Sequence, residues 1–124
     1  MESPYKGKTG LKRIWNALFY SLDGLAAAFK HEGTFRQEVL LALILVPIAV
    51  YLPLSGVGKG LMIVSVLLVL IVELLNSGIE AVTDRVSLED HALAKRAKDL
   101  GSAAVMLSLI NVAAVWLLVI FGQS

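Results

Sequence analysis

Apolar residues recur along this chain in one periodic segment and in three long runs. From Leu11 to Phe29 the apolar positions advance by four and three residues in turn, which is the spacing of one face of an α-helix. Polar and basic residues occupy the other sides. We therefore expect residues 1–30 to form a loose polar arm followed by an amphipathic helix. Basic residues at its start and Trp15 favour a helix lying in a membrane interface, and an ordinary soluble surface helix is the alternative.

The three apolar runs are long enough to cross a membrane. They predict membrane helices over residues 35–54, 58–85 and 100–122. Pro47 lies inside the first run, where a membrane helix tolerates the kink. Proline and glycine residues in segment 53–60 predict a tight turn between the first two helices. The polar stretch 87–99 is expected to be a short helix or a helical link. The fold class is thus an all-α membrane protein with an N-terminal amphipathic interfacial helix.

Composition agrees with one integral membrane domain, 1–124. The 124 residues are 57% hydrophobic, far above the usual share in a soluble domain. A net charge of +1 provides no overall field that would attract nucleic acid. The absence of cysteine excludes disulfides, thiolate metal sites and cysteine nucleophiles. The polar start lacks the apolar region of a signal peptide, so we expect the internal segments to direct membrane insertion.

Basic residues are unevenly distributed among the connections. The N-terminal segment and residues 85–99 are rich in Lys and Arg, whereas the turn between the first two spans has only Lys59. The positive-inside rule therefore places the N-terminus and residues 85–99 in the cytoplasm, and the C-terminus outside.

A polar stripe closes the second predicted span. On a helix at about 100° per residue, Glu73, Asn76, Glu80 and Asp84 fall within roughly 80° of one another. A charge at membrane depth costs at least about 2.5–3.5 kcal/mol on insertion scales. A solvated rim explains charges at the membrane boundary, but it explains Glu73 poorly because further apolar residues follow it. Glu73 is therefore a candidate functional residue.

Helix packing also bears on this stripe. Ser77, Gly78 and Ala81 are small residues that let a neighbouring helix approach closely. Three spans offer few helices to enclose a polar site, so oligomerisation is the simplest way to shield it.

The residue types in and around the stripe are suited to phosphoryl transfer. Clustered carboxylates near solvent can hold Mg²⁺, which usually arrives with nucleotide phosphates. Cations such as Lys98 can bind those phosphates. A deeper carboxylate can take a proton from a lipid hydroxyl. On spacing alone, a transporter or a proton-relay carboxylate is the more common use of such a residue.

Three motifs resemble the conserved blocks of the prokaryotic diacylglycerol kinase family. They are E-G-T-F-R-Q-E at 32–38, V-E-L-L-N-S-G-I-E-A-V-T-D-R at 72–85, and A-K-R-A-K-D-L-G-S-A-A-V at 94–105. The resemblance extends from about residue 11 to 116. It implies a homotrimeric kinase of the bacterial inner (cytoplasmic) membrane, multi-pass with a cytoplasmic N-terminus, that uses ATP with Mg²⁺ to convert diacylglycerol to phosphatidic acid. T-D-R and K-D-L-G-S-A-A-V favour this branch over the undecaprenol kinases, which remain the alternative together with a small membrane transporter.

The same resemblance implies roles for individual residues. Glu73 resembles the catalytic base, with Asn76 beside it, and Glu32 and Glu80 resemble the metal ligands. The implied ATP contacts are Arg13, Tyr20, Glu32, Glu80, Glu89, His91, Lys98 and Asp99. The implied contacts to the lipid substrate are Glu73, Phe35, Arg36, Gln37, Glu38 and Ser102. Asp84 has two open interpretations, because it either touches the nucleotide site or pairs with a cation at the rim.

Overall fold

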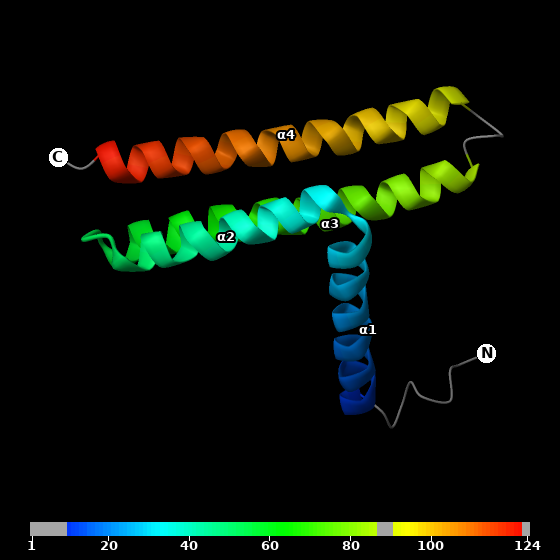
Figure 1. Cartoon of the computed structure of the whole chain (residues 1–124), viewed down its shortest axis with the longest axis horizontal. Helices are drawn as coiled ribbons and strands as arrows, with labels where there is room; N and C mark the ends of the chain where they lie inside the picture. The colour runs from blue at the N-terminus through cyan, green and yellow to red at the C-terminus, as the bar shows by residue number, and fades with distance from the viewer. Residues whose placement is uncertain (1–9, 87–90, 123–124) are drawn as a thin grey trace.

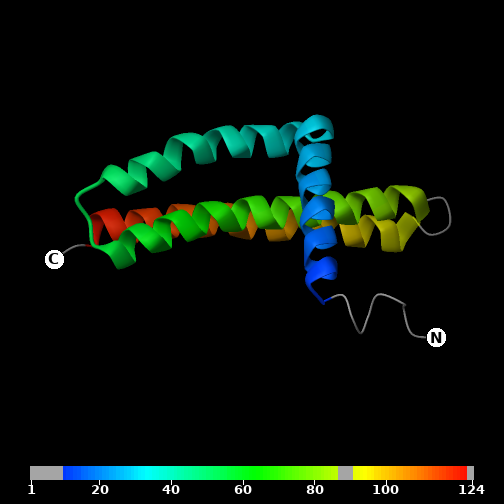
Figure 2. The same ribbon diagram turned by 90° about the horizontal axis from the view of Figure 1, so that it is seen from below.

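Four helices make up the part of the chain that the structure, a computed structural model, describes, namely residues 10–86 and 91–122. They are α1 (Gly10–His31), α2 (Gly33–Tyr51), α3 (Gly56–Val86) and α4 (His91–Phe121). Helices α2, α3 and α4 run along the long axis of the molecule, and α1 projects crosswise from them (Figures 1 and 2). Within the described ranges the all-α prediction is confirmed.

The last three helices are each long and apolar enough to span a membrane. They cover Gly33–Tyr51, Gly56–Arg85 and Ala92–Phe121, so the expectation of three membrane-capable helices is confirmed. Helices α3 and α4 each have 31 residues, which corresponds to about 46 Å at 1.5 Å per residue. This exceeds the roughly 30 Å of a bilayer's hydrocarbon core. Both helices are therefore long enough to extend beyond it.

Helix α2 ends earlier in the chain than the sequence pattern predicts. The expected boundary is residue 54, but α2 ends at Tyr51 and Leu52 is extended, with φ −65° and ψ 144°. The reason is Pro53, because a proline ring disfavours the helical conformation of the residue before it. Helix α3 then begins at Gly56, two residues before the expected boundary at 58. The Ser55 hydroxyl accepts a hydrogen bond from the Gly58 amide at 3.1 Å, which caps this start.

Helix α4 begins earlier than the apolar pattern indicates. The apolar run predicts a start near residue 100, yet α4 starts at His91. The polar residues 91–99 form its first turns, so the helical interpretation of this stretch is confirmed for them. Ala, Leu, Lys and Arg are strong helix formers, and Lys95 pairs with Asp99 one turn away at 2.7 Å. We call residues 80–86 and 91–99 together the α3–α4 end of the bundle.

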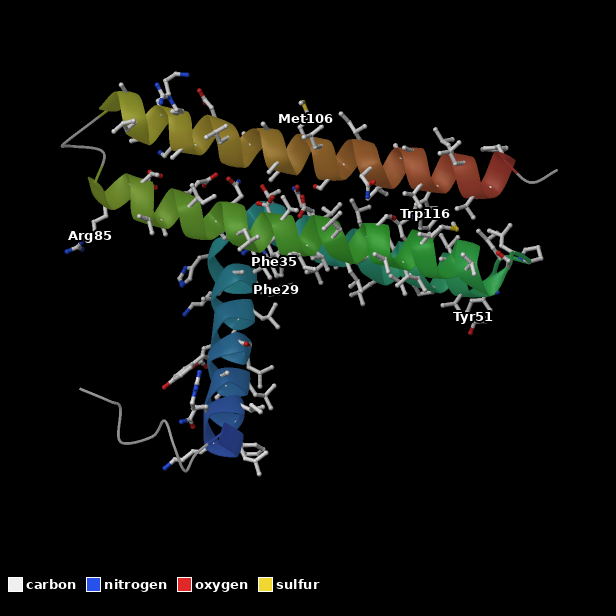
Figure 3. The ribbon with its side chains drawn as sticks, turned by 180° about the vertical axis from the view of Figure 1, so that it is seen from behind. Phe29, Phe35, Tyr51, Arg85, Met106 and Trp116 are labelled. Atoms are coloured by element: carbon white, nitrogen blue, oxygen red, sulfur yellow. The ribbon has the colours of Figure 1, made fainter. Side chains whose placement is uncertain are left out.

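Helix α3 is the centre of the bundle and packs against both α2 and α4. At the opposite end from the α3–α4 end, Trp116 Nε1 of α4 donates to the Met62 carbonyl of α3 at 3.2 Å. The Ser65 hydroxyl donates to the same carbonyl at 2.6 Å, and Met62 and Ser65 are both fully buried. Figure 3 shows Trp116 at this contact between the two helices. The small interior leaves many large apolar side chains exposed in a single chain, such as Leu118 at 71%.

A single extended residue turns the chain at the corner between α1 and α2. Glu32 has φ −113° and ψ 104° and is the N-cap of α2. The Arg36 guanidinium Nη1 donates to the carbonyls of Phe29 at 2.8 Å and Lys30 at 2.9 Å, near the end of α1. Phe35 is buried at this corner, close to Phe29 in Figure 3. These contacts fix where Glu32 lies relative to the bundle.

Candidate functional site

The polar stripe of α3 forms one continuous face, as its spacing predicts. Glu73 and Asn76 are buried, with exposed fractions of 6% and 8%, whereas Glu80 is exposed. Asn76 Nδ2 donates to Glu80 Oε1 at 3.1 Å, one helical turn away. The Asn76 amide therefore lies along the helix between a buried carboxylate and an exposed one, and it is hydrogen-bonded to the exposed one.

The backbone of helix α4 comes close to this stripe at Gly101. Gly101 is buried, and a Cβ atom placed there would overlap Asn76 Oδ1. The sequence assigns close approach to Ser77, Gly78 and Ala81, but a Cβ on Gly78 would have nothing within 4 Å in this chain. The residue that the sequence interpretation did not identify as a site of close helix approach is Gly101. Its sequence signal is a lone glycine inside a helix, which usually has a packing or functional reason.

Three carboxylates, from α2, α3 and the α1–α2 corner, lie within electrostatic range of Glu73. Glu73 feels the like charges of Glu80 and Glu32, and Glu38 feels that of Glu73. Glu38 is only 9% exposed, and its Oε2 has no hydrogen-bond partner among the described residues. A bound cation would relieve this concentration of negative charge.

The carboxylates alone do not form a complete metal cage. Within residues 10–86 and 91–122, no three His, Asp or Glu side chains are close enough to hold an ion among themselves. Mg²⁺ commonly binds through one or two carboxylates and completes its octahedron with water and substrate phosphates. Glu32 and Glu80 fit that pattern, because both lie near Glu73 and neither is buried.

Two ion pairs occupy the α3–α4 end. Lys98 Nζ lies 2.5 Å from Asp84 Oδ1, and Lys95 Nζ lies 2.7 Å from Asp99 Oδ2. Asp84 thus has a cation partner at the rim, and that partner, Lys98, is itself one of the implied ATP contacts. Lys98 also lies within electrostatic range of Glu80. The cation is paired with Asp84 and also interacts electrostatically with the exposed carboxylate of the stripe.

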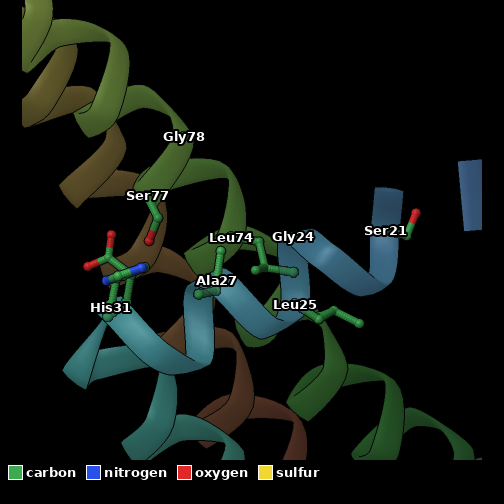
Figure 4. A pocket seen from close by; sticks show the side chains of 10 residues that line it. Ser21, Gly24, Leu25, Ala27, His31, Leu74, Ser77 and Gly78 are labelled. Carbon is green, nitrogen blue, oxygen red and sulfur yellow. The ribbon is translucent and has the colours of Figure 1, made fainter. Parts of the chain in front are cut away.

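An open groove runs between α1 and α3, with a volume of about 660 Å³. Figure 4 shows His31 and Ser77 on its two walls. Glu32 is the one carboxylate among its lining residues, which are Ser21, Gly24, Leu25, Ala27, Ala28, His31, Glu32, Leu74, Ser77 and Gly78. The volume falls within the usual range for ligand pockets.

A second, smaller cavity of about 210 Å³ lies among α2, α3 and α4. Glu38 is its only polar lining residue. The others are Leu41, Ala42, Leu45, Val66, Val69, Leu109, Val112 and Ala113. The cavity therefore combines an apolar wall with one buried carboxylate.

Several predicted site residues lie apart from this centre. Arg13 is 18 residues before the end of α1, which is about 27 Å of helix, and Tyr20 is 71% exposed. Figure 1 shows α1 running away from the bundle toward its N-terminal end. Glu89 lies outside the described residues, and only the helical backbone of His91 is described. Gln37 and Ser102 are exposed.

Comparison with known proteins gives matches over almost the whole chain. Residues 19–120 match the family model described as prokaryotic diacylglycerol kinase. A diacylglycerol kinase of Pseudomonas aeruginosa is 55% identical over 120 residues, which cover 97% of this chain and 98% of the relative. Diacylglycerol kinases of Haemophilus influenzae and Escherichia coli K12 are 50% and 47% identical, covering 87% and 93% of this chain and 92% and 94% of each relative.

Proposed function

The chain belongs to the prokaryotic diacylglycerol kinase family, and from this membership we propose that it transfers the γ-phosphoryl group of ATP to the free hydroxyl of diacylglycerol. The products are phosphatidic acid and ADP. The observation that carries the proposal is the order of groups along α3. Glu73 is buried at the level of the membrane-capable segment, and Glu80 is exposed about 10 Å nearer the α3–α4 end by helix rise. Such a stripe can serve a lipid and a soluble substrate together.

In the proposed reaction Glu73 is the general base. Its carboxylate accepts the proton of the lipid hydroxyl as that oxygen forms a bond to the γ-phosphorus. The bond between the γ-phosphorus and the bridging oxygen breaks, and ADP leaves with the electron pair. Such transfers depend on positioning and on electrostatic stabilisation more than on covalent chemistry. The burial of Glu73 limits the access of water, which would otherwise compete with the lipid hydroxyl as nucleophile.

Glu32 and Glu80 are the proposed Mg²⁺ ligands. When bound, Mg²⁺ supplies positive charge to the phosphates of ATP. Asn76 holds the Glu80 carboxylate through the hydrogen bond at 3.1 Å. The corner at Glu32, tied by Arg36, brings the second carboxylate to the same side of α3. Lys98, which lies within electrostatic range of Glu80, is proposed to donate to phosphate oxygens.

We assign the two cavities to the two substrates. The open groove beside Glu32 accepts part of the nucleotide. The apolar cavity beside Glu38 accepts an acyl portion of the lipid, with the buried carboxylate near its hydroxyl. The further ATP contacts in this proposal are Arg13, Tyr20, Glu89, His91 and Asp99. The further lipid contacts are Phe35, Arg36, Gln37 and Ser102.

Assembly in the membrane completes the proposal. Helix α1 lies in the interface on the cytoplasmic side, because it projects crosswise from the membrane-capable helices and exposes Leu11, Trp15 and Leu18. The N-terminus and the α3–α4 end are then cytoplasmic, and the membrane is the bacterial inner membrane. The chain is a homotrimer, in which neighbouring copies cover the apolar faces that one chain leaves exposed.

A reconstitution assay tests this function against its alternatives. The purified full chain is placed in lipid vesicles with γ-labelled ATP, Mg²⁺, and either diacylglycerol or undecaprenol. We expect label in phosphatidic acid. Label in undecaprenyl phosphate alone identifies an undecaprenol kinase. No label in either lipid, with assembled protein, contradicts the kinase proposal and favours a transporter that uses Glu73 as a proton relay.

A further inference from the structure

At Gly101 the backbone of α4 meets a polar amide of the functional stripe. A Cβ atom on Gly101 would overlap Asn76 Oδ1 and would lie 3.2 Å from Asn76 Cγ. Both residues are buried. Helix α4 lies alongside α3 in every view (Figures 1, 2 and 3). The Asn76 amide is therefore packed directly against the α4 backbone.

The asparagine amide needs such an external constraint. Rotation about the Cβ–Cγ bond of Asn is broad and roughly two-fold, so the side chain does not fix the direction of its own amide group. Asn76 Nδ2 donates to Glu80 Oε1, and Oδ1 is buried with no hydrogen-bond partner among the described residues. Turning the amide by 180° would direct Oδ1 at the Glu80 carboxylate, where two acceptors repel each other. The Gly101 backbone limits the orientations of the Asn76 amide that are intermediate between these two.

We infer that Gly101 is a positioning residue for the reaction: it holds the Asn76 amide in the orientation that directs Nδ2 to Glu80. A methyl group at position 101 displaces the amide, breaks the hydrogen bond, and leaves the exposed Glu80 carboxylate free to rotate. The consequence is a weaker Mg²⁺ site, although Gly101 touches neither metal nor substrate. This inference rests on the proposed function, because it assigns Glu80 to the metal.

The competing explanation is that Gly101 only lets two helices pack closely. The chain provides a matched control for that effect, because a Cβ on Gly58 would lie 2.9 Å from Val119 Cγ1, at the other end of the same α3–α4 contact. At Gly58 the Cβ would meet a valine methyl group and, at 3.3 Å, the Ser55 hydroxyl that caps α3, whereas at Gly101 it would meet the Asn76 amide. A second control is Gly60, where a Cβ would have nothing within 4 Å. The variant Gly60→Ala therefore shows what a Gly→Ala change in a helix does when the new methyl group contacts nothing.

The experiment is a double-mutant cycle in the reconstituted full chain. Gly101→Ala, Asn76→Ala and the double variant are compared with wild type, and Gly58→Ala and Gly60→Ala are the controls. The measurements are kcat/KM for ATP, the Mg²⁺ concentration for half-maximal rate, and the dissociation constant of Mg-ATP by calorimetry. The dissociation constant can be measured without turnover. It therefore gives the coupling between the two positions even in variants that are too slow for a rate measurement.

The inference predicts strong coupling between the two positions. Gly101→Ala lowers kcat/KM by about tenfold and raises the Mg²⁺ requirement, because a hydrogen bond to a charged group is lost. In the Asn76→Ala background the same change has less than about a twofold effect, since no amide remains to be displaced. Gly58→Ala and Gly60→Ala leave the Mg²⁺ requirement unchanged. Equal effects of Gly101→Ala in both backgrounds, or an unchanged Mg²⁺ requirement, overturn the inference. The wild-type rate tests the proposed function separately.

Discussion

Lys98 Nζ of α4 lies 2.5 Å from Asp84 Oδ1 of α3, and this ion pair joins the two helices at the α3–α4 end. Both side chains are substantially exposed, at 45% and 63%. Exposed pairs of this kind contribute little to stability and are weakened by salt. The pair is therefore more informative about where the Lys98 ammonium is held than about what holds the fold together.

Removing the cation and removing its partner should have different effects. We expect Lys98→Ala to raise the KM for ATP by about tenfold or more, because a phosphate contact is lost. Asp84→Asn should change that KM by less than about threefold, since the lysine ammonium is retained within electrostatic range of Glu80. Steady-state kinetics at fixed ionic strength measure both values. An Asp84→Asn variant that is as impaired as Lys98→Ala would place Asp84 in the nucleotide site itself.

The corner between α1 and α2 depends on Arg36. Its guanidinium donates to the carbonyls of Phe29 and Lys30, and we expect Arg36→Ala to cost about 1 kcal/mol of stability through these two bonds. The larger effect should be on the orientation of α1 and hence on Glu32. The distribution of distances between spin labels on α1 and α4 should be broader in Arg36→Ala than in wild type. Arg36→Lys should keep part of the wild-type distribution. An unchanged distribution would show that Arg36 does not hold the corner.

Glu80 should determine the metal requirement. We expect Glu80→Gln to raise the Mg²⁺ concentration for half-maximal rate by about tenfold or more, because a charged oxygen ligand becomes a neutral one. Glu32→Gln should act in the same direction. Glu38→Gln is the matched control, since Glu38 is buried in the apolar cavity rather than beside the proposed metal. A Mg²⁺ titration in the reconstituted enzyme measures all three, and an unaltered requirement in Glu80→Gln would contradict the ligand assignment.

The helices could be predicted from the sequence because apolar periodicity and run length carry that information directly. The boundaries were harder to predict, because Pro53 ends α2 at Tyr51 and good helix formers continue α4 back to His91. The stripe from Glu73 to Glu80 was predictable from helical spacing alone. The contact between Gly101 and Asn76 was not, because it depends on how two helices separated along the chain are rotated against each other. The hydrogen bonds from Arg36 to the end of α1 were not predictable either, because they depend on the angle between α1 and α2.

The most direct test of this account is the rate of label transfer from γ-labelled ATP to diacylglycerol by Glu73→Gln. Glutamine keeps the size of the side chain but is a very weak base. We expect the rate to fall by about 10²–10⁴-fold, the usual contribution of a general base. The dissociation constant of Mg-ATP should stay within about threefold of wild type. A rate within tenfold of wild type, in a correctly assembled variant, would contradict the assignment of Glu73 as the base.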